Sequence, residues 1–448
     1  MELNPETGEL YQVYIDELDT IFLHQNAKVR KFKAYFRGKN PTLLDKPAQA
    51  KPDNRVPTPI ARKLVKQMKG YGSRAGYIQY STEDPEYIAM IKNDVLDMND
   101  EELLTSELFE NACSIGWGYE LLRVDEQLGI RMYRVKPQNG WMVYDNTLEE
   151  RKLAFVVRDR IQRVDGGKVV DYDVQTIYYD TFFVEYMRPM GGGQWQETDR
   201  RDHPFGFVPG VKYVVNNEET PIFEPVIPLI DEHDKVISTV SNELEKFAQA
   251  VLLSLLEIDQ ETSENVQFTK IFDSLGIPGE NRSVQDIMAY LVKPSRGDDN
   301  DRTADRLERL IYDQAMIVNL ADLNLGANMS SKALRDKILL MEWLMADCEA
   351  YFSKGLQERF TLIANAMTEL RGNNQEWVTI SWRRNLPPDL EAMARSADLL
   401  RGTLSLETIL KTVFPADIVP DVMAEIDRLR ETSLPAISLD DDDSPNLN

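Results

Sequence analysis

The most extended amphipathic pattern in the chain runs from Pro225 to about Glu257. Apolar residues recur there every three or four positions, the spacing that draws one stripe along a helix. The stripe comprises Ile230, Val236, Ile237, Val240, Leu244, Phe247, Ala248, Val251, Leu252 and Leu255. Such a helix would span roughly 48 Å, more than a compact domain usually needs. We therefore expect another subunit to cover part of it, with Leu244, Phe247 and Val251 in the interface.

The same periodicity predicts helices elsewhere in the chain. They cover an N-terminal stretch that turns basic between Lys28 and Lys39, and residues 59–70, 85–116, 301–320, 332–370, 389–401, 405–412 and 420–431. An irregular segment, residues 259–300, separates the helix at 225–258 from the one at 301–320. These two helices should form a hairpin with the irregular segment at its tip. Asn and Gly residues then interrupt the helical pattern at 321–331.

Between Tyr119 and Tyr213 the period of the pattern changes to two. Apolar and aromatic residues alternate with polar ones, and glycine pairs at 166–167 and 191–193 mark turns. The pattern predicts an antiparallel meander, and short strands are also expected at 71–80 and 377–384. Aromatic side chains at strand spacing favour a packed core over a platform for stacked bases.

Length and net charge limit the kinds of protein that this chain can be. The 448 residues are enough for two to four compact regions, and the formal charge of -24 argues against a protein that grips nucleic acid over a broad surface. An acidic wall would instead let nucleic acid slide past. The basic part of the N-terminal helix is most simply a solvated face, with nucleic-acid or membrane contact as the alternative. The sequence shows neither an apolar run long enough to span a membrane nor a stretch that resembles a signal peptide, so we expect synthesis in the cytosol.

Candidate chemistry is sparse. Cys113 and Cys348 are the two cysteines, and the three histidines are far apart in sequence, so neither disulfides nor a zinc site are predicted. No nucleotide-binding or hydrolase motif occurs. The four adjacent carboxylates at 440–443 lie on an acidic tail that we expect to be disordered and solvated. The sequence thus predicts no enzyme, no cofactor and no metal, and favours a structural or conduit function.

Several segments together resemble the portal proteins of tailed bacteriophages, in particular of phages with long non-contractile tails. The segments are NRVPTPIARKLVKQMKGYGSRAGYIQY, IGWGYELLRVDEQLGIRMYRVKPQNGWMVYD, HPFGFVPGVKYVVNNEE, PLIDEHDKVISTVSNELEKFAQAVL, ADLNLGANMSSKALRDKILLMEWLM, ISWRRNLPPDLEAMA and LSLETIL. The resemblance covers residues 54–431. The chain departs from the family at Ser331, where a glycine is usual, which affects the expected geometry of the nearby loop.

The resemblance implies an α+β portal-type fold with a wing, a long-helix stem, a clip insert and a short C-terminal crown. By analogy the divisions are 1–224 wing, 225–258 stem helix, 259–300 clip, 301–320 returning stem helix, 321–331 channel loop, 332–388 long helix and strand of the wing, 389–431 crown and 432–448 disordered tail. It also implies a homo-oligomeric ring, typically of twelve subunits, at the capsid vertex of the virion. The subunits would be made in the host cytoplasm.

The same resemblance implies that the ring is the channel for packaging and ejection of double-stranded DNA. Implied partners are the terminase large subunit, a head-completion or adaptor protein, and the major capsid and scaffolding proteins; no membrane is implied. The channel loop would present Asp322, Leu323, Asn324, Leu325, Gly326, Ala327, Asn328 and Met329 to DNA. Terminase and adaptor would meet the clip at Ile287, Met288 and Tyr290.

Three arginines of the returning helix, Arg302, Arg306 and Arg309, fall on one face. They either face phosphates in the channel or pair with Asp305, Glu308 or acids of a neighbouring subunit. Two other functions stay open at this stage. One is a scaffold or adaptor of virion assembly that oligomerises without a DNA channel, and the other is a carboxylate-based nuclease or phosphoesterase.

Overall fold

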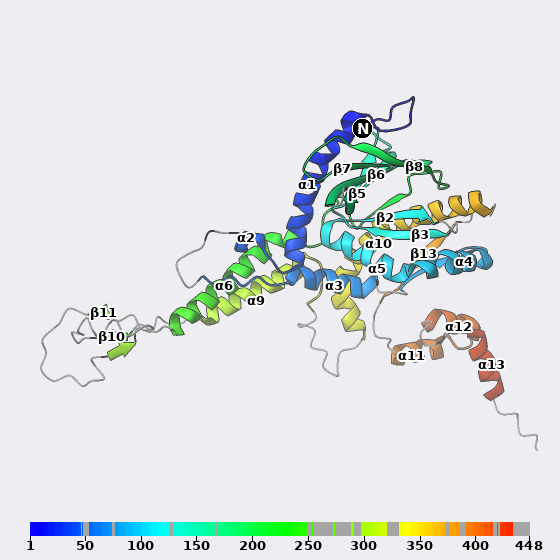
Figure 1. The fold of residues 1–448 in the computed structure, drawn as a ribbon. Coiled ribbons are helices and arrows are strands. Elements are labelled where there is room, and N and C mark those ends of the chain that lie inside the picture. The colour runs from blue at the N-terminus through cyan, green and yellow to red at the C-terminus, as the bar shows by residue number, and fades with distance from the viewer. Residues whose placement is uncertain are drawn as a thin grey trace, which may run out of the picture. The chain divides into compact units, whose positions relative to one another are not determined.

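The computed structural model describes residues 1–45, 47, 53–73, 77–125, 129–165, 168–248, 252–254, 272–273, 288–290, 297–319, 331–371, 377–384, 390–414, 419 and 422–432. The chain forms two compact units, Met1–Asn385 and Leu386–Asn448, which we describe separately. The first unit contains helices and largely antiparallel sheets in separate runs of the chain (Figure 1), which confirms the predicted α+β class.

Helices open the first unit. They are α1 (Gln12–Phe36), α2 (Pro41–Leu44), α3 (Ile60–Gly72), α4 (Pro85–Ile91) and α5 (Glu101–Ile115). The helix predicted over 85–116 is interrupted, because a π turn (Lys92–Leu96) and a 3-10 turn (Asp97–Asn99) follow α4 and Asp100 adopts a left-handed φ of 47°. The side chain of Asn99 bonds the carbonyls of Val95 and Ile130, which ties this break to the sheet.

Two sheets follow, where the sequence predicts a single meander. Strands β4 (Gly140–Tyr144), β5 (Lys152–Asp165), β6 (Lys168–Tyr178), β7 (Phe182–Pro189) and β8 (Gln196–Asp202) form a five-stranded meander. Strands β2 (Trp117–Val124), β3 (Ile130–Val135) and β9 (Gly210–Val214) form a separate sheet in the order β3-β2-β9. The prediction was wrong here because β9 returns to pair with β2, as in Gly118 opposite Tyr213.

The core lies between α1 and the five-stranded sheet and continues between the two sheets. Ile15, Leu18 and Phe22 of α1 pack with Val156 and Ile177 of the sheet, and α1 runs beside these strands in Figure 1. A second cluster joins the sheets and includes Tyr119, Phe155 and Tyr178, which are all buried. The aromatic residues at these strand positions are therefore core residues, as the alternation predicts.

The predicted helical hairpin is present with different ends. A 3-10 turn (Glu224–Val226) leads into α6 (Ile227–Ala248), and α9 (Gly297–Gln314) returns beside it (Figure 1). The helix predicted over 225–258 is too long, because β10 (Leu252–Ser254) is a strand paired with β11 (Phe272–Asp273) and β12 (Met288–Tyr290). An apolar run such as residues 251–256 fits a buried strand as well as a helix.

The returning helix is displaced from its predicted range of 301–320. It begins at Gly297 and ends at Gln314, after which Met316 takes a left-handed φ of 56°. The rest of the hairpin tip lies outside the described residues. Of the predicted clip, 259–300, the structure describes 272–273, 288–290 and 297–300, and of the predicted channel loop, 321–331, it describes Ser331.

The long helix α10 (Ser331–Arg371) agrees with the helix predicted over 332–370. Strand β13 (Thr379–Trp382) follows it and pairs with β1 (Ile78–Ser81), so both predicted short strands are present. The first is shorter than the predicted 71–80, because residues 71–72 still belong to α3. The second unit contains α11 (Leu390–Leu400), α12 (Leu406–Val413) and α13 (Val422–Thr432), which match the three predicted C-terminal helices. Residues 433–448, most of the predicted tail, lie outside the described residues.

Candidate functional site: the α6–α9 helix pair

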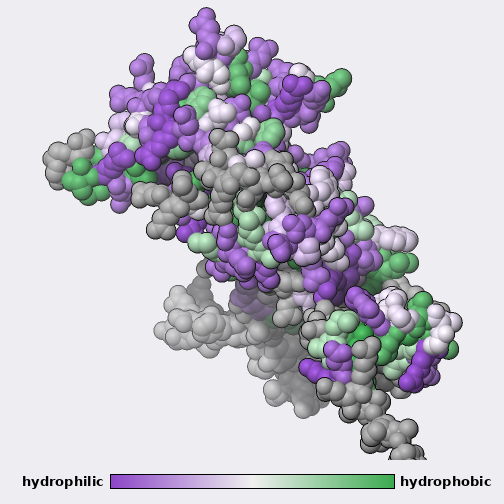
Figure 2. Space-filling model, turned by 90° about the vertical axis from the view of Figure 1, so that its right-hand side faces the viewer, coloured by the Kyte–Doolittle hydropathy of each residue, from purple (hydrophilic) through white to green (hydrophobic). Residues whose placement is uncertain are grey.

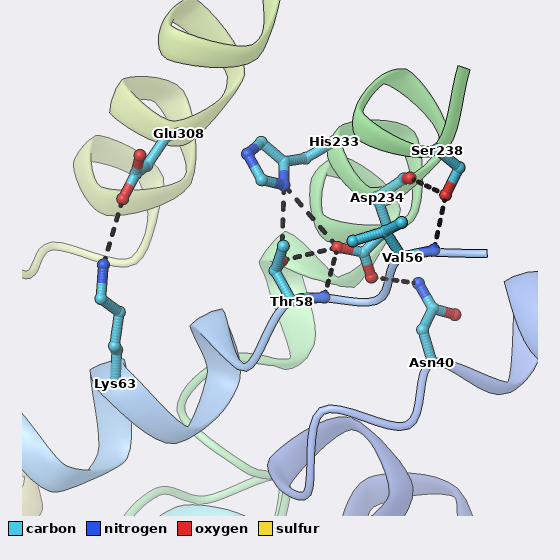
Figure 3. A network of polar contacts seen from close by, with 8 residues as sticks. All are labelled: Asn40, Val56, Thr58, Lys63, His233, Asp234, Ser238 and Glu308. Carbon is cyan, nitrogen blue, oxygen red and sulfur yellow. Dashed lines mark hydrogen bonds and ion pairs between the residues drawn. The ribbon is translucent and has the colours of Figure 1, made fainter. Parts of the chain in front are cut away.

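A buried carboxylate fastens α6 to the segment that precedes α3. Asp234 is 0% exposed, and three donors surround it (Figure 3). The backbone N–H and the hydroxyl of Thr58 donate to Oδ1 at 2.9 and 2.6 Å, and Asn40 Nδ2 donates to Oδ2 at 2.9 Å. His233 lies beside this group, with Nδ1 3.4 Å from the Thr58 hydroxyl oxygen. The three hydrogen bonds offset the cost of burying this polar side chain.

The contact continues for two more turns of α6. Ser238 accepts from the backbone N–H of Val56 at 3.0 Å, and Asn242 accepts from the backbone N–H of Asn54 at 2.6 Å. Asp234, Ser238 and Asn242 are spaced by four residues, so they form one polar row along the helix. We call this row the polar seam. It satisfies backbone groups of an extended segment that has no strand to pair with.

The sequence interpretation missed the polar seam, although a signal for it exists. Polar residues at i, i+4 and i+8 interrupt the apolar pattern of α6 on a single face. Their partners could not be found from the sequence, since Asn40 and Asp234 lie 194 residues apart. The seam fixes the start of the hairpin to the residues that precede α3.

Helix α9 is held from both sides. Ala304, Ile311 and Tyr312 are buried on one face. Glu308 pairs with Lys63 of α3 at 3.4 Å (Figure 3), and Asn300 donates to Glu243 of α6 at 3.3 Å. These contacts orient α9 and thereby decide which of its side chains remain in solvent.

Arg302, Arg306 and Arg309 lie on the exposed part of α9. Within the part of the chain that the structure describes, no carboxylate lies at ion-pair distance from any of the three, and Glu308 is instead engaged by Lys63. Pairing with Asp305 or Glu308 inside the subunit is thus not seen. Three unpaired guanidinium groups on one helix face can bind an anion from outside the subunit, because arginine bonds phosphate and carboxylate oxygens in pairs.

The apolar stripe of α6 is only partly covered by its own subunit. Leu244 is 65% exposed, and Val236, Ile237 and Val240 are half-buried. The other two predicted interface positions, the side chain of Phe247 and Val251, lie outside the described residues. An exposed leucine in line with half-buried residues of the same helix is suited to contact with another protein surface.

Among the described residues, the two cysteines are not set up as nucleophiles. Cys113 and Cys348 are both buried, and burial raises the pKa of each thiol, to about 12 for Cys348, so both stay protonated. Among the described residues, no cluster of His, Cys, Asp and Glu could hold a metal ion. In the same residues no helix combines the length and the apolarity that crossing a bilayer requires. On the face in Figure 2, hydrophobic residues form separate groups among hydrophilic ones.

Comparison with known proteins assigns the family. The profile described as "Phage portal protein, SPP1 Gp6-like" matches residues 15–434. A search of curated proteins finds no match. A solved structure described as the neck of a native GTA particle computed with C12 symmetry is similar over 80% of this chain and 89% of that chain, with 13% identity and a TM-score of 0.41.

Membership in this family implies a structural component of the virion that works as a ring oligomer at the capsid vertex. The α+β architecture with its long helical hairpin agrees with that assignment. Because the family profile covers nearly the whole sequence, the chain belongs to the phage portal proteins of the SPP1 Gp6-like family.

Proposed function

We propose that this portal protein forms the channel through which double-stranded DNA enters the capsid and later leaves it. The α6–α9 pair is the stem of each subunit, and the exposed face of α9 lines the channel. Arg302, Arg306 and Arg309 support the proposal, because they are three exposed cations without an ion-pair partner among the described residues, in a chain whose formal charge is -24.

This charge distribution suits a conduit. A ring of such acidic subunits repels phosphates over most of its surface, so DNA is not held tightly at any one place. A few cations on the channel wall would keep the duplex centred, since each contact is weak and is screened at physiological salt. A ring that gripped DNA along its whole length would need a broad basic surface, against which the formal charge of -24 argues.

The remaining parts keep the roles that the family resemblance implies, as proposals. Residues 321–331 connect α9 to α10 and would touch the duplex mainly through polar and steric contacts, because they include Asp322 and no basic residue. The hairpin tip around β12, with Ile287, Met288 and Tyr290, would dock the terminase large subunit before packaging and a head-completion protein afterwards. Twelve subunits per ring is part of the same proposal.

The test replaces the three arginines of α9 together with glutamate. The R302E/R306E/R309E subunit should still fold and form rings, because the three side chains are exposed and unpaired in the described subunit. DNA packaged per particle in an in vitro packaging assay should fall several-fold. The matched control is Arg151→Glu, an exposed arginine in the turn before β5 that pairs with Glu149, which should package normally. Normal packaging by intact rings of the triple variant would contradict the proposal.

A further inference from the structure

A second cationic surface lies away from the α6–α9 pair, where the two sheets meet. A cavity of about 440 Å³ opens between β2 and β3 on one side and β5, β6 and β7 on the other. Four basic residues line it, Arg123, Arg134, Lys136 and Arg163. Tyr133 lies among them and is half exposed.

Helix α1 extends this surface with Lys33 and Arg37, which are four residues apart and so share a face. Burial lowers the pKa of Lys33, and the positive charges of Arg37, Lys136 and Arg134 lower it further. Lys33 is therefore close enough to Arg37, Arg134 and Lys136 for their positive charges to repel one another. We call the six basic residues the cationic groove: Lys33, Arg37, Arg123, Arg134, Lys136 and Arg163.

The subunit does little to neutralise the groove. Arg134 pairs with Glu107 of α5 at 2.9 Å. Within the described residues, Lys33, Arg37, Lys136 and Arg163 have no carboxylate at ion-pair distance. A net-acidic chain has many carboxylates available for pairing, so an unpaired cluster of cations is costly and is relieved by an external anion.

The two acids that line the cavity are already engaged. Asp159 accepts a hydrogen bond from Asn139 at 3.0 Å, and Glu185 accepts one from Thr198 at 3.0 Å. Neither forms an ion pair with a groove residue. With Glu107 these two carboxylates offset three of the six positive charges, so the groove presents an excess of positive charge to solvent.

We infer that the cationic groove binds the phosphate backbone of duplex DNA outside the channel. Lysine and arginine from four separate elements, α1, β2, β3 and β5, and the residues that directly follow α1 and β3 converge on one open groove, which is the footprint of a polyanion. A subunit contact would more naturally use the exposed large apolar residues of α10, Leu339, Leu340 and Trp343. The inference rests on the proposed function for the identity of the ligand, yet it concerns DNA that is not threaded through the ring.

The test uses closed circular duplex DNA, which has no end and cannot thread a closed ring. Assembled rings of the wild type and of K33Q/R37Q/K136Q are titrated with the circle at several salt concentrations. The variant should bind at least tenfold more weakly near about 50 mM salt, and its log-log salt slope should be smaller by about two to three, since each lost phosphate contact removes about 0.9.

Two control variants are included. The first distinguishes loss of charge from loss of folding, and the second distinguishes binding at the groove from binding in the channel. K33R/K136R keeps the charge and should bind the circle like the wild type. R302Q/R306Q/R309Q should also bind the circle normally, although the proposed function requires it to package linear DNA poorly. If this channel variant packages DNA normally while binding of the circle still depends on the groove residues, the channel proposal is wrong and the groove proposal is kept.

Three results would overturn the inference. One is equal affinity of the wild type and K33Q/R37Q/K136Q for the circle. Another is loss of rings in that variant, which would place the groove between subunits. In the third, an acidic peptide with the sequence of residues 432–448 binds the wild type but not the variant, while the circle binds neither protein.

Discussion

Arg359 of α10 and Glu120 of β2 form an ion pair in which both side chains are wholly buried, with 2.8 Å between Nε and Oε2. Arg359 Nη1 also donates to Glu101 and Thr105 of α5, at 2.7 Å each. The hydroxyl of Tyr213 on β9 donates to the same Glu120 oxygen. This network fastens α10, the helix that follows the proposed channel loop, to the three-stranded sheet and to α5.

Replacing Arg359 with methionine should destabilise the subunit by about 3 to 5 kcal/mol, because Glu101 and Glu120 would stay buried without their cation. Urea unfolding followed by circular dichroism measures the loss. Arg428→Met is the control, since that arginine is exposed in the second unit and should change stability by less than about 1 kcal/mol. Equal unfolding midpoints for Arg359→Met and the wild type would show that the network contributes nothing.

Asp234→Ala should loosen α6 from the residues that precede α3, because Thr58 and Asn40 lose the carboxylate that accepts their three hydrogen bonds. Hydrogen bonds to a charged group contribute roughly 1.5 to 3 kcal/mol each and do not add fully. Hydrogen exchange should become faster along residues 233–245. Glu232→Ala, an exposed position on the same helix, should leave exchange unchanged, and unchanged exchange in Asp234→Ala would contradict the anchoring role of the polar seam.

Acid should weaken the contact between α1 and the five-stranded sheet. Asp19 pairs with Arg158 at 2.7 Å and with Arg188 at 2.8 Å. Burial raises the pKa of the Asp19 carboxyl, but the hydrogen bonds and charges of the two arginines outweigh it, and the pKa in the folded chain lies below its ordinary value of 3.8. A lowered folded pKa gives stability that is present above pH 3.8 and lost as the pH falls through the folded pKa.

Asp19→Asn should therefore lower the urea midpoint at about pH 7, and its difference from the wild type should shrink as the pH falls below the ordinary carboxyl pKa. Glu17→Gln, an exposed neighbour on α1, is the control and should follow the wild type at every pH. A difference between Asp19→Asn and the wild type that is the same at about pH 7 and about pH 3 would exclude this ion pair as its cause.

Leu244→Asp should prevent ring formation while the subunit stays folded, because Leu244 is 65% exposed in the subunit and lies on the apolar stripe of α6. Light scattering should report the mass of a single subunit, and circular dichroism should report wild-type helix content. Leu148→Asp, at a fully exposed position in the turn before β5, serves as the control. Rings of normal mass from Leu244→Asp would place the subunit interface elsewhere.

Elements whose structure depends on local periodicity could be predicted from the sequence. The ends of α10 lie within one residue of the predicted 332–370, since a long 3.6-residue pattern leaves few alternatives. The co-facial spacing of Arg302, Arg306 and Arg309 was likewise visible in the sequence. Whether these arginines meet DNA, however, depends on other subunits and stays a prediction.

Long-range partners were not predictable in the same way. The pairing of Gly118 with Tyr213 splits the expected meander into two sheets, and the partner of Asp234 lies 194 residues away in Asn40. The strand at Leu252–Ser254 was missed because it forms only by pairing with residues 272–273 and 288–290. Each of these features is decided by tertiary contacts that a single sequence does not display.

In the proposed function, the arginine face of α9 lines a channel occupied by DNA. The most direct measurement places a photo-crosslinking amino acid at Arg306 in rings stalled during packaging of labelled duplex DNA, with the same amino acid at Arg151 as the control. The account predicts DNA crosslinks at position 306 that require packaging to have started, and none at position 151. Absence of crosslinks at 306 in stalled particles that contain DNA would contradict it.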